Sequence, residues 1–528
     1  MTDRHRGKRI IAGFVTAFVV GVILGSLVQT QFNLLALQEL GVSVDMSARL
    51  STSFQDLLHF APLYAVLFGV SFLLSLLVAA ALLRLLGLGA RAPFYALAGA
   101  AGLWVTLSIV NALAPMPTLI AATRTPDGLV AMLFTAALAG WLFAWLTAGS
   151  RRTAGGFSTG PALVFLLSAG MLWPGAQARA ESADAYQVQT YTEGLEHPWS
   201  LVFLPSGGAI VTERPGRLRL LSEEGALESG EITGVPAIFH SGQAGLFDVA
   251  ISPQFASDSL LFLSYACGSA TANHLCVARG RLQGRALNDV MEIFRAKPGK
   301  QGNAHYGGRM AFLPDGTLII TLGDGFDYRE QAQVLSNHLG SIVRLRPDGS
   351  VPQDNPFMGR EDVRPEIYSY GHRNVQGLIY DPVDNLLIAH EHGPRGGDEI
   401  NIIEPGDNYG WPVITYGLDY TGAMVSPFTE REGMEQPALQ WTPSIAPSGM
   451  TRYRGELFPA WQGSLFVGAL ADRSVHRVEL AGREARDVET LFADLGERIR
   501  DVVTGPDGAL YLLTDSPDGR VLRVSPGR

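Results

Sequence analysis

Four long apolar stretches lie in the first 150 residues of the chain, near residues 10–28, 60–83, 93–113 and 129–148. An α-helix needs about 20 apolar residues to cross about 30 Å of hydrocarbon, and each stretch is long enough. Residues 186–528 instead carry charged residues, glycine and proline at the density of a water-soluble domain. We therefore expect a helical transmembrane region over residues 1–150 and a separate aqueous domain over residues 186–528.

The segment between these two regions, residues 151–185, contains a shorter apolar run from Pro161 to Trp173. It follows Arg151-Arg152 and ends near Ala178-Arg179-Ala180, which has the form of a signal peptide with an A-x-A cleavage site. The sequence leaves open whether this run is cleaved or is kept as a fifth helix.

The basic residues of the first 152 positions predict an orientation. If every span crosses, one side of the membrane receives Arg4, Arg6, Lys8, Arg9, Arg84, Arg91, Arg151 and Arg152, and the other receives only Arg49 and Arg124. Cytoplasmic loops carry the excess of Lys and Arg, so the N-terminus is expected in the cytoplasm and residues after 175 outside. This predicts a bacterial inner-membrane protein whose aqueous domain lies in the periplasm. The net charge of −10 argues against nucleic acid as a partner.

The helical region has two possible roles. It is interpreted as an anchor and export device, but polar residues near the ends of the expected spans also permit a quinone or lipid site, namely Gln55, Asp56, His59 and Asn111.

The aqueous domain is predicted to be all-β. Short β-type runs alternate with turn signals, as at Pro314-Asp-Gly, Pro347-Asp-Gly, Pro506-Asp-Gly and Pro517-Asp-Gly. About 340 residues at about 55 per unit favour a six-bladed β-propeller, with a pair of β-sandwiches as the alternative. Cys267 and Cys276 are the only cysteines, and outside the cytoplasm a disulfide between them is expected.

Polar residues concentrate in turns between the β-type runs, where a propeller gathers its loops around a central channel. His305 is a candidate general base, and Arg373, Arg498 and Arg500 can bind an anionic ligand bidentately. The main-chain carbonyls of Glu391-His-Gly-Pro and the carboxylates of Asp398-Glu399 suit Ca²⁺, because hard cations prefer oxygen.

Six motifs carry a resemblance to a known family. The chain from about residue 190 to 525 resembles the pyrroloquinoline-quinone (PQQ)-dependent aldose sugar dehydrogenases of the glucose/sorbosone dehydrogenase family. The motifs are Glu196-His-Pro-Trp-Ser, Thr212-Glu-Arg-Pro-Gly-Arg, Gly371-His-Arg-Asn-Val-Gln-Gly, Glu391-His-Gly-Pro-Arg-Gly-Gly-Asp-Glu, Asn408-Tyr-Gly-Trp-Pro and Arg498-Ile-Arg-Asp-Val. Their shared order makes the resemblance specific, and it implies a six-bladed propeller.

The resemblance also implies roles for individual residues. His305 would be the general base in oxidation of a sugar to a lactone, and Gln243 would position it. Arg373, Asn374 and Gln376 would contact PQQ, and Arg498 and Arg500 would hold its carboxylates. The carbonyls of Gly393 and Pro394 would bind a catalytic Ca²⁺, and Glu399 with the main chain of Tyr409 would form part of a second, structural Ca²⁺ site. For Asp398 three roles are open: it binds calcium, supports a hydrogen-bond network of the loop, or faces the substrate.

One position departs from the family pattern. The family's glucose dehydrogenases have a lysine against the cofactor in the segment corresponding to Ala469-Leu-Ala-Asp-Arg473, and this chain has none there; Arg473 is the candidate substitute.

The expected function is periplasmic oxidation of aldose sugars with PQQ and Ca²⁺, and electron transfer to ubiquinone or a cytochrome. A calcium-dependent propeller lactonase and a non-enzymatic sugar sensor are the alternatives.

Overall fold

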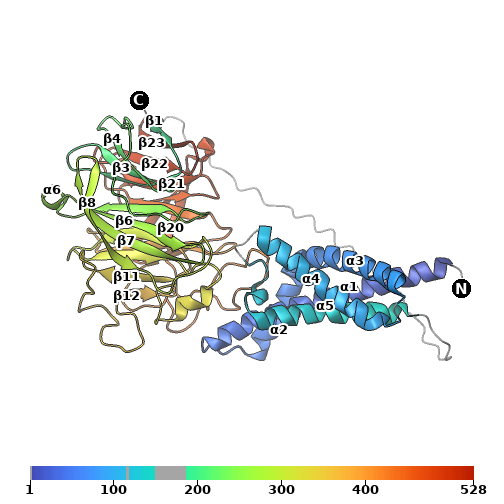
Figure 1. Ribbon diagram of the computed structural model, residues 1–528. Coiled ribbons are helices and arrows are strands. Elements are labelled where there is room, and N and C mark those ends of the chain that lie inside the picture. Colours follow the sequence, from blue (N-terminus) through green and yellow to red (C-terminus); the bar gives the residue numbers. More distant parts are fainter. Residues whose placement is uncertain (1–2, 88, 114–117, 149–185, 528) are drawn as a thin grey trace.

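The computed structural model describes residues 3–87, 89–113, 118–148 and 186–527. Figure 1 shows two parts, a bundle of helices and a ring of β-sheets, which meet at one end of the bundle. The predicted signal-like run Pro161–Trp173, and the rest of residues 149–185, lie outside the described residues.

The helical region contains the four predicted spans. The helices α1 (Asp3–Glu39), α3 (Ala61–Leu86), α4 (Arg91–Leu113) and α5 (Pro126–Thr147) are each long and apolar enough to cross a membrane. A fifth helix, α2 (Met46–His59), and the 3-10 turn η1 (Ala121–Arg124) lie at the end of the bundle that faces the propeller. The sequence analysis did not predict α2, which is amphipathic and begins with the Asp45 side chain accepting from Ala48 N.

Small residues allow the helices of the bundle to approach closely. A Cβ atom at Gly140 would collide with the carbonyl of Tyr95, and one at Gly99 would collide with the carbonyl of Ala136. Such close backbone contact between α4 and α5 is typical of membrane helices, where packing rather than hydrophobic burial drives association.

The basic residues of the bundle separate as their alternation along the sequence predicts. Arg9 Nε donates to the carbonyl of Leu146 at 2.9 Å, and Arg91 Nη2 to Thr147 Oγ1 at 3.5 Å, so both lie at the end remote from the propeller. Arg49 lies in α2 and Arg124 in η1, at the end that contacts the propeller.

The β-domain is a six-bladed propeller, as predicted, and not a pair of sandwiches. Five sheets have four strands and one has three among the described residues. The blades are β2 (Pro198–Phe203), β3 (Ala209–Glu213) and β4 (Arg217–Leu221); β5 (Leu246–Ile251), β6 (Leu260–Ser269), β7 (Ala272–Gln283) and β8 (Ala286–Arg295); β9 (Gly307–Phe312), β10 (Leu318–Leu322), β11 (Ser341–Leu345) and β12 (Ile367–Tyr370); β13 (Val375–Asp381), β14 (Leu386–Glu391), β15 (Asp398–Ile402) and β16 (Leu439–Trp441); β17 (Pro447–Arg452), β18 (Leu465–Ala469), β19 (Val475–Ala481) and β20 (Glu484–Leu491); and β21 (Ile499–Thr504), β22 (Leu510–Thr514) and β23 (Gly519–Pro526) with β1 (Tyr186–Leu195).

Local chemistry explains the turns and the closure of the ring. In Pro314-Asp-Gly the Asp315 side chain accepts from the main chain and hydroxyl of Thr317, which closes the turn between β9 and β10. The last blade is completed by the first strand, because β1 pairs antiparallel with β23. This pairing joins the two ends of the propeller sequence. The remaining helical turns of the domain are α6 (Phe255–Asp258), η2 (Arg329–Gln333), η3 (Pro459–Trp461) and η4 (Ala493–Leu495).

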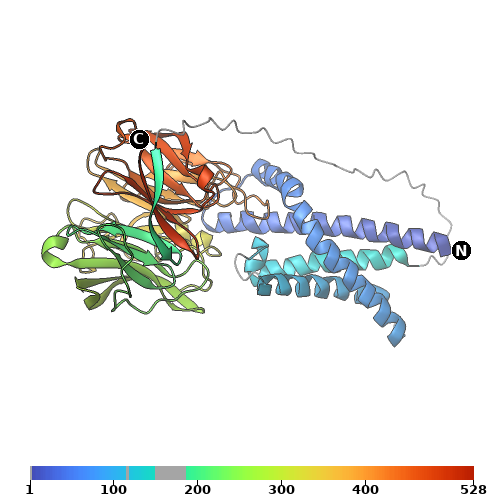
Figure 2. The same ribbon diagram turned by 90° about the horizontal axis from the view of Figure 1, so that it is seen from above.

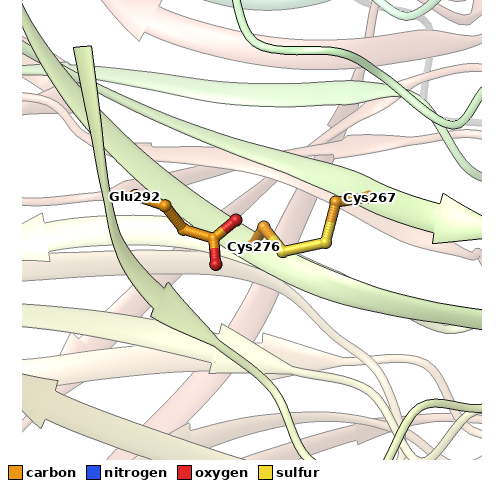
Figure 3. Close-up of side chains that lie close together, drawn as sticks. All are labelled: Cys267, Cys276 and Glu292. Carbon is orange, nitrogen blue, oxygen red and sulfur yellow. A yellow bond between two sulfur atoms is a disulfide. The ribbon is translucent and has the colours of Figure 1, made fainter.

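The two cysteines form the expected disulfide. Cys267 lies in β6 and Cys276 in β7, and their sulfur atoms are bonded across this hairpin. Figure 3 shows the Glu292 carboxylate beside the disulfide. These three residues do not form a metal site, because the sulfurs are joined to each other, and Glu292 is paired with Arg295 at 2.8 Å.

Candidate active site

Antiparallel order places the start of the first strand of each blade and the end of its second strand at the same end of the sheet. His305 precedes β9 and Asp324 follows β10, while Arg373 precedes β13 and His392 follows β14. The loops that carry the predicted site residues therefore meet on one face of the propeller. The helical region contacts this same face, through the segments after β10 and before β16.

His305 is buried and held by two neighbouring segments. Its Nδ1 lies 2.7 Å from Asp324 Oδ1, and its main-chain N–H donates to Gln243 Oε1 at 2.9 Å. The second oxygen of Asp324 accepts from Trp411 Nε1 at 2.8 Å. With Nδ1 donating to the carboxylate, the lone pair of His305 is on Nε2. The predicted pairing of Gln243 with the candidate base is thus present as a contact with its main chain.

The electrostatics of the site keep His305 neutral. Burial, with the positive charge of Arg373 next in size, lowers the pKa of His305 to about 4, against a smaller opposing effect of Asp324. At neutral pH the imidazole therefore has a free lone pair and is able to accept a proton. His305 also has a positive φ of 53°, a conformation that non-glycine residues seldom adopt and that is found at functional sites.

Arg373 is buried among carbonyls and aromatic rings. Its Nη1 donates to the carbonyls of Gly393 at 2.6 Å and His392 at 3.1 Å. Its guanidinium carbon lies 5.2 to 5.9 Å from the ring centres of Phe326, Trp411 and Tyr420. Phe326 also packs on His305, with 4.5 Å between ring centres, so the candidate base and the arginine lie against the same ring.

Asn374 and Gln376 join the blade of β13 to the blade of β9. Asn374 Oδ1 accepts from Gly307 N at 3.1 Å, and Gln376 Nε2 donates to the carbonyl of Gly307 at 3.3 Å. Both side chains lie beside the His305 loop, in accord with the predicted grouping of these residues.

The two arginines predicted to hold cofactor carboxylates share one acidic partner. Asp515 Oδ2 accepts from Arg498 at 3.1 Å and from Arg500 at 2.9 Å. Arg500 is buried, and burial lowers its pKa, whereas the side chain of Arg498 is 43% exposed. Arg473, the candidate substitute for the missing lysine, is exposed and donates to the carbonyl of Gly496 at 3.1 Å.

The predicted calcium segment is a tight loop organised by Asp398. One oxygen of Asp398 accepts from Gly393 N at 2.8 Å, and the other accepts from Ser444 Oγ, Ile445 N and Ala446 N at 2.7 to 2.9 Å. Both oxygens are thus occupied by donors of the protein, which favours a loop-organising role. A Cβ atom at Gly393 would collide with the main chain of Gly397, so the loop requires glycine there.

Two carboxylates lie beside this loop, the buried Glu391 and the half-buried Glu399. Burial and the neighbouring Glu391 raise the pKa of Glu399 well above its ordinary value, and Asn401 is its hydrogen-bond donor, at 3.2 Å. Glu391 accepts from His372 Nδ1 at 2.8 Å, and the ring of His372 stacks on Tyr409. Glu391, Glu399 and Tyr409 line one small cavity together with Gly393.

The sequence analysis missed several residues that the fold brings to the site: Asp324, Phe326, Tyr420 and the buried Lys300. Lys300 Nζ lies 3.8 Å from the ring centre of Tyr306, and burial lowers its pKa to about 7. A signal for Asp324 was present, since Gly323-Asp-Gly-Phe directly follows the apolar run Leu318–Leu322. No comparable local signal marks Lys300 or Tyr420.

Comparisons with known proteins identify the family and the fold of the β-domain. The sequence model of the family described as Glucose / Sorbosone dehydrogenase matches residues 195–523. A crystal structure of a glucose dehydrogenase is 46% identical, with a TM-score of 0.62, over 64% of this chain and 99% of that chain. The apo-form of the soluble aldose sugar dehydrogenase of Escherichia coli is 42% identical, with a TM-score of 0.62, over 65% of this chain and 99% of that one. The PQQ-bound aldose sugar dehydrogenase of Streptomyces coelicolor is 30% identical, with a TM-score of 0.53, over 65% of this chain and 98% of that chain.

Proposed function

Because the chain belongs to the glucose/sorbosone dehydrogenase family, we propose that it is a PQQ-dependent dehydrogenase that oxidises aldose sugars at C1 to lactones. The observation that carries the proposal is the placement of a neutral, buried His305, held by Asp324, against the same ring as Arg373. A base and a fixed cation side by side suit removal of a proton and stabilisation of developing negative charge.

In this proposal His305 moves the proton. Its Nε2 accepts the proton of the sugar C1 hydroxyl as hydride leaves C1, which converts C1 to the lactone carbonyl. Asp324 holds the imidazole in the required tautomer and stabilises the imidazolium that forms. Gln243 fixes the main chain of His305, and Trp411 fixes Asp324.

The residues of the channel fit PQQ, a planar compound with three carboxylates. Arg500 and Arg498 share Asp515, and a guanidinium has five N–H donors, so donors remain for a carboxylate of the ligand. The half-exposed ring of Tyr420 beside Arg373 offers a surface for a flat molecule. When bound, the quinone supplies the acceptor for the hydride.

Calcium is the second proposed cofactor. The carbonyls of Gly393 and Pro394 would hold it near Arg373, and Glu399 with the carbonyl of Tyr409 would hold a second ion. Two carboxylates, Glu391 and Glu399, line one small cavity, and a hard cation would balance their charge. In the first site Ca²⁺ would act as a Lewis acid, and in the second site it would stabilise the structure. Asp398 is assigned the loop contacts instead.

We infer further that the four apolar helices anchor the enzyme in the bacterial inner membrane with the propeller in the periplasm. The separation of Arg9 and Arg91 from the propeller end of the bundle supports this orientation. A propeller face held against membrane helices also supports electron transfer to a membrane acceptor, ubiquinone or a cytochrome.

Reconstitution tests the proposed function. Purified full-length protein loaded with PQQ and Ca²⁺ is expected to reduce a dye in the presence of an aldose, and His305→Ala is expected to abolish the reaction. His5→Ala, at the exposed start of α1, is the control and retains activity. No activity across a broad panel of sugars contradicts the proposal. Turnover of lactones without PQQ would indicate a lactonase. Sugar binding without any turnover would indicate a sensor.

A further inference from the structure

One cavity beside Arg373 is lined by both parts of the molecule. The propeller contributes Phe326 and Arg373, and the helical region contributes Thr118, Ala121 and Arg124. The cavity volume is about 30 Å³, whereas pockets for small organic ligands have about 300–1,000 Å³. Because Arg373 lines this small cavity together with the segment Thr118–Arg124, that segment, here called the wall segment, lies close to the candidate site.

Polar contacts fix the wall segment to the propeller loop after β10. Thr118 donates to Asp327 through its main-chain N at 3.2 Å and through its hydroxyl at 2.9 Å. Arg124 donates to both oxygens of Glu330, at 3.0 and 3.2 Å, and to the carbonyl of Asp327 at 3.2 Å. These groups are largely buried, so the bidentate pair is stronger than an exposed one.

A second group of contacts fixes the helical region at α2. Asp56 accepts from Met424 N at 2.8 Å and from Thr30 Oγ1 at 2.6 Å. Asn33 donates to the carbonyl of Met424 at 2.9 Å and accepts from Arg329 at 2.8 Å. Because Arg329 also pairs with Glu330 at 2.9 Å, the two groups of contacts are linked.

Apolar packing adds a third attachment between the helical region and the propeller. Leu34, Leu37 and Val42 form one buried cluster with Val413 and Ile414. Removal of a single polar contact therefore loosens the wall segment locally, while the remaining attachments keep the two parts together.

We propose that the wall segment Thr118–Arg124 limits the size of the sugar that reaches the site, so that the helical region is a specificity determinant of the enzyme. Phe326 packs on His305, so a sugar with C1 at His305 would lie next to Phe326, and the cavity of about 30 Å³ between Phe326 and the wall segment has no room for a further sugar ring. A second sugar ring linked to the first then meets the wall segment. Single-ring aldoses are therefore preferred over disaccharides.

The proposal rests on the proposed function and concerns a part of the chain outside the family match. The family model begins at residue 195, so the wall segment is not part of the propeller shared with the relatives. Size selection by this segment would distinguish the chain from enzymes that consist of the propeller alone.

Kinetics of the full-length, PQQ- and Ca²⁺-loaded protein test the proposal. The measured quantity is the ratio of kcat/KM for glucose to kcat/KM for maltose, with one small dye as acceptor. Arg124→Ala is expected to lower this ratio at least threefold through the KM for maltose. Ala121→Trp is expected to raise it at least threefold. The matched control Ala256→Trp, on the exposed helix α6, leaves it unchanged.

Thiol labelling gives a readout without sugar oxidation. The native cysteines are joined in a disulfide, so Ala121→Cys introduces the only free thiol. A small methanethiosulfonate is expected to react at least tenfold faster than a methanethiosulfonate carried on a bulky polymer, and adding Arg124→Ala is expected to reduce the difference. Ala256→Cys reacts comparably with both reagents.

The outcomes separate the two proposals. If glucose is oxidised but neither variant changes the glucose-to-maltose ratio, the size-selection proposal is wrong. If no sugar is oxidised while labelling at position 121 depends on reagent size and on Arg124, the proposed function is wrong and the wall segment still controls access. Equal labelling at position 121 by both reagents would show that the wall segment does not limit access, whether or not the protein oxidises sugars.

Discussion

At the scale of single residues, the site depends on the contact between His305 and Asp324, which are 2.7 Å apart. Asp324→Asn keeps the shape of the side chain but removes the charge and permits the wrong imidazole tautomer. We expect kcat to fall by about 100-fold with little change in KM, in line with the usual contribution of a positioned general base. Steady-state kinetics measure this, with Asp494→Asn, at an exposed position, as the control. An unchanged kcat would remove Asp324 from the mechanism.

The depressed pKa of His305 predicts a pH dependence. Burial lowers this pKa from 6.5 to about 4, so kcat/KM is expected to stay high as pH decreases through 6.5 and to decline only near pH 4. Between these values the unfolded chain binds a proton at this position and the folded protein does not. The free energy of unfolding therefore falls as pH decreases across this window.

Two measurements check this pH dependence. One is the pH profile of kcat/KM, and the other is the pH dependence of stability in the native protein and in His305→Gln, which lacks the titrating group. A decline of kcat/KM on the acidic side that is centred at pH 6.5 would show that burial does not lower the pKa of His305.

His305 could be found from the sequence because it lies in a polar turn between β-type runs and the family resemblance implies its role, but Asp324 was missed. An aspartate between two glycines reads as a turn residue, and its role depends on contacts with His305 and with Trp411, which lies 87 positions away. Such a role is set by the arrangement of blades and not by local sequence. Asp398 illustrates the reverse case, because its residue type fits calcium while its contacts are with loop donors.

At the scale of elements, the loop between β14 and β15 and the neighbouring carboxylates of Glu391 and Glu399 predict coupling between calcium binding and stability. A ligand that binds only the folded state raises the free energy of unfolding, so added Ca²⁺ is expected to raise Tm by several degrees and a chelator to reverse this. Glu399→Gln is expected to abolish most of the shift. Differential scanning calorimetry measures this shift, with Glu404→Gln, just after the end of β15, as the control. The same Ca²⁺-induced shift in Glu399→Gln would remove Glu399 from the set of metal ligands.

The sequence predicted the membrane-spanning helices and the propeller blades but not helix α2, and each result has a physical reason. The four spans follow from the length of apolar sequence, and the blades follow from Pro-Asp-Gly turns and β-type runs. Helix α2 escaped prediction because its 14 residues are too few and too polar for a span. Its stability derives instead from a helix cap and from contacts with residues near Met424.

At the scale of the whole molecule, the contact between helices and propeller was not predictable from local sequence, because it joins residues such as Asn33 and Met424, which are 391 positions apart. This contact also predicts how the chain is oriented across the membrane. Ala148 lies at the bundle end remote from the propeller, and the next described residue, Tyr186, begins β1. If the four helices span the membrane, we predict that Ala148 and the propeller lie on opposite sides of it.

Thiol labelling tests this topology. A bulky, membrane-impermeant thiol reagent is expected to label Ala256→Cys from the periplasmic side of spheroplasts and not from inside-out vesicles. Labelling only in inside-out vesicles would contradict the predicted topology. The mass of the mature protein in the membrane and soluble fractions then distinguishes cleavage after Ala180 from a retained segment.

The central claim, that this chain oxidises aldoses at C1, is tested most directly by the product. Full-length protein loaded with PQQ and Ca²⁺ is incubated with glucose and with glucose deuterated at C1, and lactone and reduced dye are quantified together. The account predicts one lactone for each pair of electrons received by the dye, a slower reaction with the deuterated sugar, and neither product with His305→Ala. Dye reduction without lactone, or lactone consumption that needs no PQQ, would contradict it.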